Sequence, residues 1–197
     1  MPAALADLQR VGVKLFCADG TAVAPHELVP VFHHWIQRSA LPDHRLVDIA
    51  DYAHVPAGPG VLVVAHEANL AVDMGDGRIG LQYTRKQPAP GALAERLRTT
   101  VKSALRACRL LEQNGELGAG LRFRGDELDL FANDRLRAPN EAATYEAFKP
   151  TLEELLRALY GDAACEIAQP SDPRSRFGFH IKAAASPSIA DLLSRLD

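Results

Sequence analysis

Residues 61–85 read VLVVAHEANLAVDMGDGRIGLQYTR. Three short runs of apolar and β-favouring residues follow one another there, namely Val61–Ala65, Leu70–Asp73 and Ile79–Arg85. Asp76-Gly77, in the second connection, is a dipeptide typical of tight hairpin turns. Connections this short join antiparallel strands, because a parallel crossover needs a dozen or more residues. The stretch therefore predicts an antiparallel meander.

The chain on either side of the meander predicts further strands and a second hairpin. Strands are expected over residues 12–17, 46–52, 165–168 and 177–183. In the last of them, apolar residues at 177, 179 and 181 alternate with Gly178, His180 and Lys182, which predicts one dry and one wet face. Gly125-Asp126 lies between two further strand-like runs, 121–124 and 127–131, and predicts the second hairpin.

Helical spacing of apolar residues marks most of the remaining segments. The clearest case is residues 92–113, and shorter helices are expected over 140–148, 150–160 and 187–196. Pro30–Arg38 fits either a short helix or an extended strand, because Pro30 would break a helix unless it lies in the first turn.

These elements predict an α+β protein, with an antiparallel meander and hairpins packed with about four helices. No strand–helix–strand unit recurs, which disfavours a parallel doubly wound sheet, and no internal repeat is visible. Residues 1–197 are expected to form a single α+β domain. The prolines and the glycine of residues 86–91 mark a possible sub-boundary between a strand-rich N-terminal part and a C-terminal helix and hairpin part.

Composition indicates a bacterial cytoplasmic protein. The net charge of −3 requires neither nucleic acid nor an anionic membrane as a partner. The three cysteines form no CxxC pair, and the N-terminus lacks the pattern of a signal peptide, so a reducing compartment is expected. The excess of Arg (17) over Lys (5), together with the many alanines, is typical of a GC-rich bacterial genome.

Six of the seven histidines lie between His26 and His66, among several carboxylates. Histidine is the commonest metal ligand in proteins and titrates near neutrality, so chemistry is sought here first. Two near-matches to the HExxH zinc-protease motif fail, because HEANL ends in leucine and HELVP ends in proline.

The best candidates for a site lie where a predicted strand meets a loop rich in proline and glycine. Catalytic candidates are Asp48, Asp51, His54, His66 and Glu67. Candidates for binding a divalent metal are Asp48, Asp51, His54, His66 and His33, and candidates for lining a ligand pocket are His33, Trp35 and Tyr52. The alternative is that the two aspartates accept hydrogen bonds from backbone donors in the turns.

Two other features allow functional hypotheses. Arginines at 135, 137, 174 and 176 would form an anion pocket if their two loops converge. The last helix carries an apolar stripe that either packs on its own chain or mediates a homo-oligomer. The function expected from all this is a small-ligand-binding or assembly module, and the alternative is a metal-dependent or His/Asp acid–base enzyme, hydrolase-like, that uses residues 26–67.

Overall fold

The computed structural model describes residues 3–56, 58–75, 77–115, 117 and 121–197. Its helices are α1 (Ala3–Ala6), α2 (Pro25–Arg38), α3 (Leu93–Glu112), α4 (Ala142–Tyr160) and α5 (Ile189–Leu196). Its strands are β1 (Val11–Cys17), β2 (Leu46–Asp51), β3 (Val61–Ala65), β4 (Ala68–Asp73), β5 (Gly80–Arg85), β6 (Phe123–Ala132), β7 (Cys165–Ala168) and β8 (Gly178–Ala183).

All eight strands belong to one antiparallel sheet, in the order β2-β3-β4-β5-β1-β6-β8-β7. The predicted meander is present as β3, β4 and β5, and the α+β class is confirmed. Strand β1 lies at the centre, because it pairs with β5 on one side and with β6 on the other. The N-terminal strand therefore joins the two parts of the chain in one sheet.

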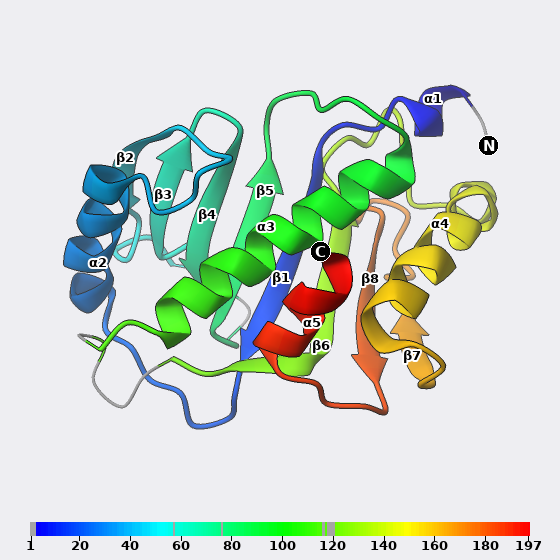
Figure 1. The fold of residues 1–197 in the computed structure, drawn as a ribbon. Coiled ribbons are helices and arrows are strands. Elements are labelled where there is room, and N and C mark those ends of the chain that lie inside the picture. Colours follow the sequence, from blue (N-terminus) through cyan, green and yellow to red (C-terminus); the bar gives the residue numbers. More distant parts are fainter. Residues whose placement is uncertain (1–2, 57, 76, 116, 118–120) are drawn as a thin grey trace.

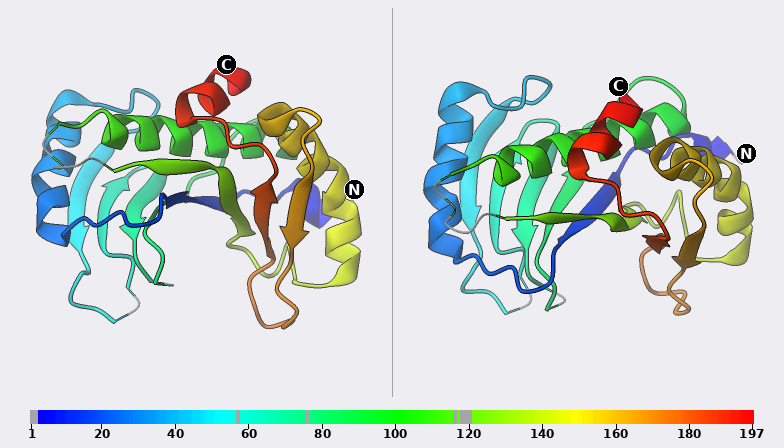
Figure 2. Two further views of the ribbon diagram at one scale, coloured as in Figure 1. Left: turned by 90° about the horizontal axis from the view of Figure 1, so that it is seen from below. Right: turned by 60° about the horizontal axis from the view of Figure 1, so that its bottom comes forward.

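Helices α3, α4 and α5 lie on one face of the sheet, and α2 stands beside β2 and β3 (Figures 1 and 2). The core lies between these layers, where Val13 and Leu15 of β1 are buried in the same cluster as Leu97 and Val101 of α3. In the described part of the chain, no helix crosses the opposite face of the sheet (Figure 2). This face, which no described helix covers, is the open face of the sheet.

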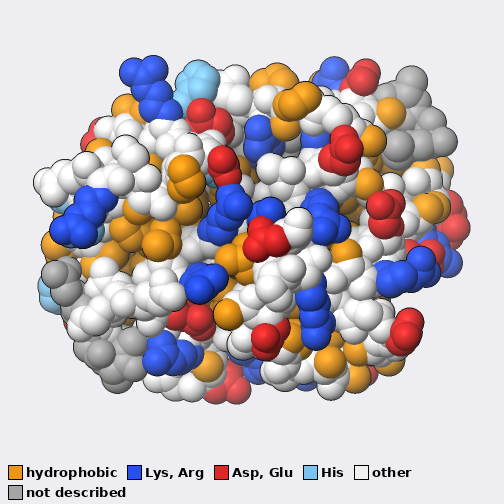
Figure 3. All heavy atoms as spheres, viewed as in Figure 1, with side chains coloured by type: hydrophobic (Ala, Val, Ile, Leu, Met, Phe, Trp, Pro, Cys, Tyr) orange, Lys and Arg blue, Asp and Glu red, His pale blue; other side chains and the backbone are white. Residues whose placement is uncertain are grey.

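The last helix packs on its own chain. Its apolar stripe is buried against α3 and α4, and consists of Ile189, Leu192, Leu193 and Leu196. Basic residues of α3 hold its end, because Arg98 donates to the Leu196 carbonyl at 3.3 Å and Lys102 pairs with Asp197 at 2.7 Å. Basic and acidic side chains are interspersed over this helical face of the molecule (Figure 3).

The predicted hairpin at Gly125-Asp126 was wrong, because β6 runs unbroken from Phe123 to Ala132. A Cβ on Gly125 would lie only 1.8 Å from the Pro187 carbonyl oxygen, so glycine allows the strand to pass close to the β8–α5 connection. The register of β6 against β1 shifts at this point, which is the signature of a bulge rather than a turn.

Two helices are longer than predicted because each tolerates an internal proline. Helix α2 begins at Pro25, five residues before the expected start, and α4 is one helix where two were expected. A proline leaves the carbonyl four residues earlier without its partner. The carbonyls at His26 and Glu146 belong to exposed residues, so water can hydrogen-bond to them.

The two parts of the chain share one plan, although no repeat was predicted from the sequence. In each part a strand is followed by a helix, then by antiparallel strands, then by a second helix on the sheet. The last of these strands returns to pair with the first, as β5 does with β1 and β8 does with β6. The second part lacks two of the strands of the first, so its residues do not recur at a fixed spacing.

The register of the central strands supports this correspondence. Lys14 of β1 pairs with Asp129 of β6. A rotation by 180° about the midpoint of this pair places β1 on β6, and it therefore exchanges the pair Val13↔Leu130 with the pair Leu15↔Leu128. Gly80 begins β5 and Gly178 begins β8. A Cβ would lie 2.6 Å from the Leu15 carbonyl at the first glycine and 2.7 Å from the Leu130 carbonyl at the second. In each half, the glycine that begins the last strand thus lies close to a backbone carbonyl of the central strand.

Candidate functional site

The open face of the sheet carries a group of charged and aromatic side chains near its centre. Because successive residues of a strand point to opposite faces, burial of Leu15, Leu128 and Leu130 in the core sends their neighbours to the open side. These neighbours, with the matching residue of β8, are Lys14, Phe16, Glu127, Asp129 and His180.

Glu127 is the centre of an ion-pair network. Arg78 donates two hydrogen bonds to its carboxylate, at 2.7 and 2.8 Å, and Arg124 lies 3.2 Å away. The hydrogen bonds from Arg78 lower the pKa of Glu127, although burial opposes this. The Arg78 guanidinium also lies 4.0 Å from the centre of the Phe16 ring. This end of the open face is therefore filled by side chains that satisfy one another.

A second ion pair closes the same region. Lys14 Nζ lies 2.5 Å from Asp73 Oδ2, and the lysine side chain is only 2% exposed. Buried charges of this kind are stable only when they are paired.

His180 connects this network to a pocket. Its Nδ1 lies 2.7 Å from Asp129 Oδ1, and its Nε2 lies 3.1 Å from Glu127 Oε1. The ring also packs edge-on against Phe16, with 5.8 Å between the ring centres. Both ring nitrogens therefore face carboxylate oxygens.

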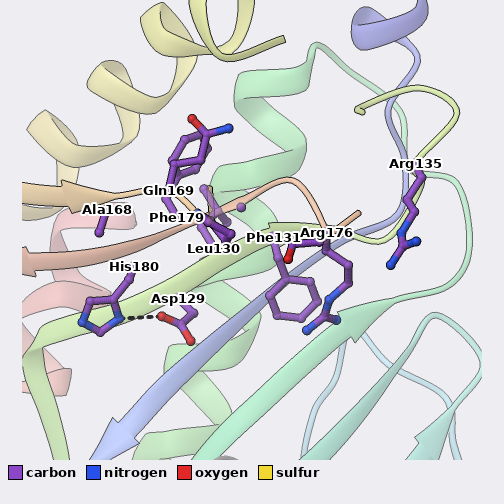
Figure 4. Close-up of a pocket in the computed structure, with 12 residues that line it drawn as sticks. Asp129, Leu130, Phe131, Arg135, Ala168, Gln169, Arg176, Phe179 and His180 are labelled. Atoms are coloured by element: carbon purple, nitrogen blue, oxygen red, sulfur yellow. Dashed lines mark hydrogen bonds and ion pairs between the residues drawn. The ribbon is translucent and has the colours of Figure 1, made fainter. Parts of the chain in front are cut away.

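The pocket has a volume of about 630 Å³ and lies along β6 and β8, bounded by the loops that follow β6 and precede β8. His180 and Asp129 lie at one end, and Arg135 and Arg176 lie toward the other (Figure 4). The Phe131 ring lies between them, with the Arg176 guanidinium 4.2 Å from its centre. One end of the pocket is thus cationic.

The two arginine-bearing loops converge, as the anion-pocket hypothesis required. Asn140 is buried and donates to the carbonyls of Pro170 at 2.8 Å and Asp172 at 2.9 Å. Gln169 donates in turn to the Asn140 side-chain oxygen at 2.8 Å. One asparagine therefore ties the loop after β6 to the loop between β7 and β8.

The four arginines of these loops differ in their partners. Arg137 is paired with Asp134 at 3.4 Å, and Arg174 is paired with Asp172 at 3.2 Å. Arg135 and Arg176 are the two that line the pocket. Over the described ranges, neither has a hydrogen bond or ion pair with another side chain.

The aspartates predicted from the sequence do not share a site. Asp48 and Asp51 are three residues apart on β2, so their side chains leave opposite faces of the strand. Each accepts a backbone N–H at 2.8 Å, from Ile49 and Ala53 respectively. These contacts match the alternative in which the two aspartates satisfy backbone donors.

The other candidates are also dispersed. His54 follows β2 beside the start of β3, whereas His66 follows the end of β3, roughly 13 Å further along that strand. His66 lines a separate shallow hollow of about 650 Å³, and Glu67 accepts the Arg45 backbone N–H at 2.8 Å.

The three residues proposed to line a pocket lie elsewhere than the pocket beside β8. His33 is exposed on α2, Trp35 is buried against Phe32 in the core, and Tyr52 is exposed after β2. Within the residues that the structure describes, no three His, Cys, Asp or Glu side chains are grouped as a metal ion would need.

The one buried histidine of the sequence cluster has a structural role. His44 Nε2 lies 2.8 Å from the Tyr83 hydroxyl, and the two rings meet edge-on. Burial lowers the pKa of His44 and raises that of Tyr83. This pair is a satisfied polar contact within the core.

Comparison of the chain with protein-family models, curated proteins and solved structures finds no match. No helix in the described residues has the length and apolar character needed to cross a membrane. Function is therefore inferred from the geometry of the site.

Sequence reasoning did not single out Asp129, Phe131 or His180. Asp129 and His180 are 51 residues apart in sequence, so their contact leaves no local motif. A signal was present in the alternation of β8, which placed His180 on the wet face of a strand beside an arginine-rich loop.

Proposed function

We propose that this protein binds a small organic anion in the pocket between β6, β8 and their loops. The observation that carries the proposal is that two guanidinium groups, Arg135 and Arg176, line the pocket and form no ion pair with a carboxylate of the described residues. Their neighbours Arg137 and Arg174 are neutralised by aspartates. An incoming anion would form charge-assisted hydrogen bonds of the strong kind.

The remainder of the pocket suits an organic group. Phe131 and Ala168 supply apolar surface. The volume of about 630 Å³ lies within the usual range of small-molecule sites. A ligand with an anionic end and an apolar or mixed body would fill it.

The contacts of His180 favour binding over acid–base catalysis. A general base must have a ring nitrogen within reach of the proton that it removes. Here both nitrogens lie within 3.1 Å of the carboxylates of Glu127 and Asp129. In this arrangement the imidazole shapes the pocket wall.

We also propose that the protein works in the bacterial cytoplasm. Cys17, Cys108 and Cys165 are all free thiols, which suits a reducing compartment. Burial raises the pKa of Cys17 to about 12, so its thiolate is scarce at neutral pH.

Thermal unfolding with a panel of small carboxylates and phosphate esters tests the proposal. A ligand at a hundred times its Kd stabilises by about 2.7 kcal/mol, which corresponds to a rise in Tm of roughly 5–10 °C for a chain of this size. The rise should shrink in Arg176→Gln and in Arg135→Gln. Arg174→Gln is the matched control, because Arg174 lies on the same loop but is paired with Asp172. Equal responses in all three variants would reject this pocket.

A further inference from the structure

We propose that the group bound by Arg176 is a carboxylate, held as Glu127 is held by Arg78. The inference rests on the proposed function and names the chemical class of its ligand. It depends on the correspondence between the two halves of the sheet, in which Arg78 and Arg176 occupy equivalent positions.

The two arginines take part in the same local arrangement. Each lies two residues before the glycine that begins a strand, Gly80 for Arg78 and Gly178 for Arg176. Each guanidinium lies over the phenylalanine next to the end of the central strand. The guanidinium-to-ring-centre distances are 4.0 Å for Arg78 on Phe16 and 4.2 Å for Arg176 on Phe131.

In the first half, the chain itself supplies an anion to this arrangement. Glu127 lies two residues before Asp129 on the neighbouring central strand and accepts two hydrogen bonds from Arg78. A planar guanidinium and a planar carboxylate form such a fork with two parallel bonds. The Arg78 guanidinium thus lies over the Phe16 ring and is hydrogen-bonded to the Glu127 carboxylate.

In the second half, none of the described residues supplies a carboxylate at the equivalent position. The residue two before Lys14, which corresponds to Glu127, is Gly12. A Cβ at Gly12 would lie 2.4 Å from atoms of the Phe131 ring, so no side chain can occupy this position while Phe131 packs there. Arg176 keeps the stacked ring but lacks the carboxylate.

The same comparison explains why the pocket lies in this half. Asp73 pairs with Gly80, and extending the register of β7 against β8 by two residues past Ala168 sets Pro170 opposite Gly178. Lys14 and Asp73 are therefore the counterparts of the pocket residues Asp129 and Pro170, and they fill the first half with an ion pair at 2.5 Å. The second half has no such pair at these positions, and about 630 Å³ stays open. The space and the unpaired guanidinium therefore occur together, and an external carboxylate satisfies both.

Calorimetric titration of the whole chain with matched probes tests this inference. The probes are phenylacetate, hexanoate and glutarate, each beside its primary amide, with phenyl phosphate and hexyl phosphate as phosphate counterparts. The carboxylates should bind at least about tenfold more tightly than their amides, because only the charged group forms the strong fork. Arg176→Gln should abolish that preference, and Arg174→Gln should keep it.

The outcomes separate the inference from the proposed function. Binding of the phosphate esters alone, dependent on Arg176, would overturn the carboxylate assignment and leave an anion-binding pocket. Binding of no anion by the wild-type chain would overturn both.

A second experiment uses the first half as a reference. Glu127→Ala removes the internal carboxylate and leaves room beside Arg78, whereas Glu127→Gln fills the same space with an amide. Acetate should raise the Tm of Glu127→Ala by about 2–4 °C more than that of Glu127→Gln. A larger rise with phosphate than with acetate would contradict a preference of this arrangement for carboxylates. If Glu127→Ala does not fold, the calorimetric titrations of the wild-type chain and of its Arg176→Gln and Arg174→Gln variants test the carboxylate assignment on their own.

Discussion

Replacing Glu127 by Gln should destabilise the protein, because it removes the charge at the centre of the ion-pair network on the open face. The carboxylate is 7% exposed and contacts three cationic or imidazole side chains, namely Arg78, Arg124 and His180. The variant keeps the size of the side chain but removes its charge, and it turns an N–H₂ group toward a guanidinium or the imidazole. The experiment therefore measures the electrostatic part of the network.

The magnitude follows from the contacts. Removing one partner of a fully buried pair costs about 3–5 kcal/mol. The Arg78 side chain is 41% exposed, so water recovers part of that loss for Arg78. A hydrogen bond to a charged group contributes about 1.5–3 kcal/mol. We therefore expect a loss of about 2–3 kcal/mol, which lowers the Tm by roughly 5–10 °C in a chain of this length.

The lowered pKa of Glu127 determines how the stabilisation by this side chain changes with pH. The folded-state pKa of Glu127 lies below its ordinary value of 4.5 because Arg78 hydrogen-bonds to the charged form. The stabilisation is therefore complete above about pH 4.5, and it is lost as the pH falls through the folded pKa. Denaturant unfolding of both proteins from neutral to acidic pH should show the two curves converging in acid. A difference that is absent at pH 7, or that is constant down to acid pH, would refute the reasoning.

Three further predictions concern the rest of the fold. Gly125→Ala should lower the free energy of unfolding by about 2–4 kcal/mol, because its Cβ would lie 1.8 Å from the Pro187 carbonyl oxygen. Gly115→Ala is the control and should change that free energy by less than about 0.5 kcal/mol, since its Cβ meets no atom within 4 Å. Equal urea midpoints of the two variants would contradict this prediction. Tyr83→Phe should cost about 1–2 kcal/mol by leaving buried His44 without its partner, and thermal unfolding would show whether the loss occurs. A thiol reagent should label Cys165 first, because Cys165 is partly exposed whereas Cys17 and Cys108 are buried; mass spectrometry of the native protein would detect a different order.

The sequence predicted those elements whose signals are local. The meander was predicted from three short apolar runs and a turn dipeptide, and α3 from apolar residues at helical spacing. The hairpin at Gly125 was wrong because the same turn chemistry also serves a bulge, and only contact with Pro187 distinguishes the two. Internal prolines led the prediction to start α2 too late and to divide α4 into two helices, since exposure of the affected carbonyls is not visible in a sequence.

The candidate site was less accessible from sequence. The arginines of the two loops were recognised by their composition, but convergence depends on Asn140, whose partners are about 30 residues away. The histidine-rich segment attracted attention by residue type alone, and the structure spreads its members over α2, β2 and both ends of β3. The repeat was hidden because the second half is shorter, so equivalent residues lie at unequal spacings.

The pairing of Lys14 with Asp129 has a consequence for how the chain could be divided. Each residue is the counterpart of the other in the two halves, and they lie opposite each other on adjacent strands. Two copies of the first half joined through β1 would place lysine against lysine, and two copies of the second half would place aspartate against aspartate. Like charges directly opposite are unfavourable in an antiparallel pair. Fragments separated between α3 and β6 should therefore associate with each other in preference to their own kind.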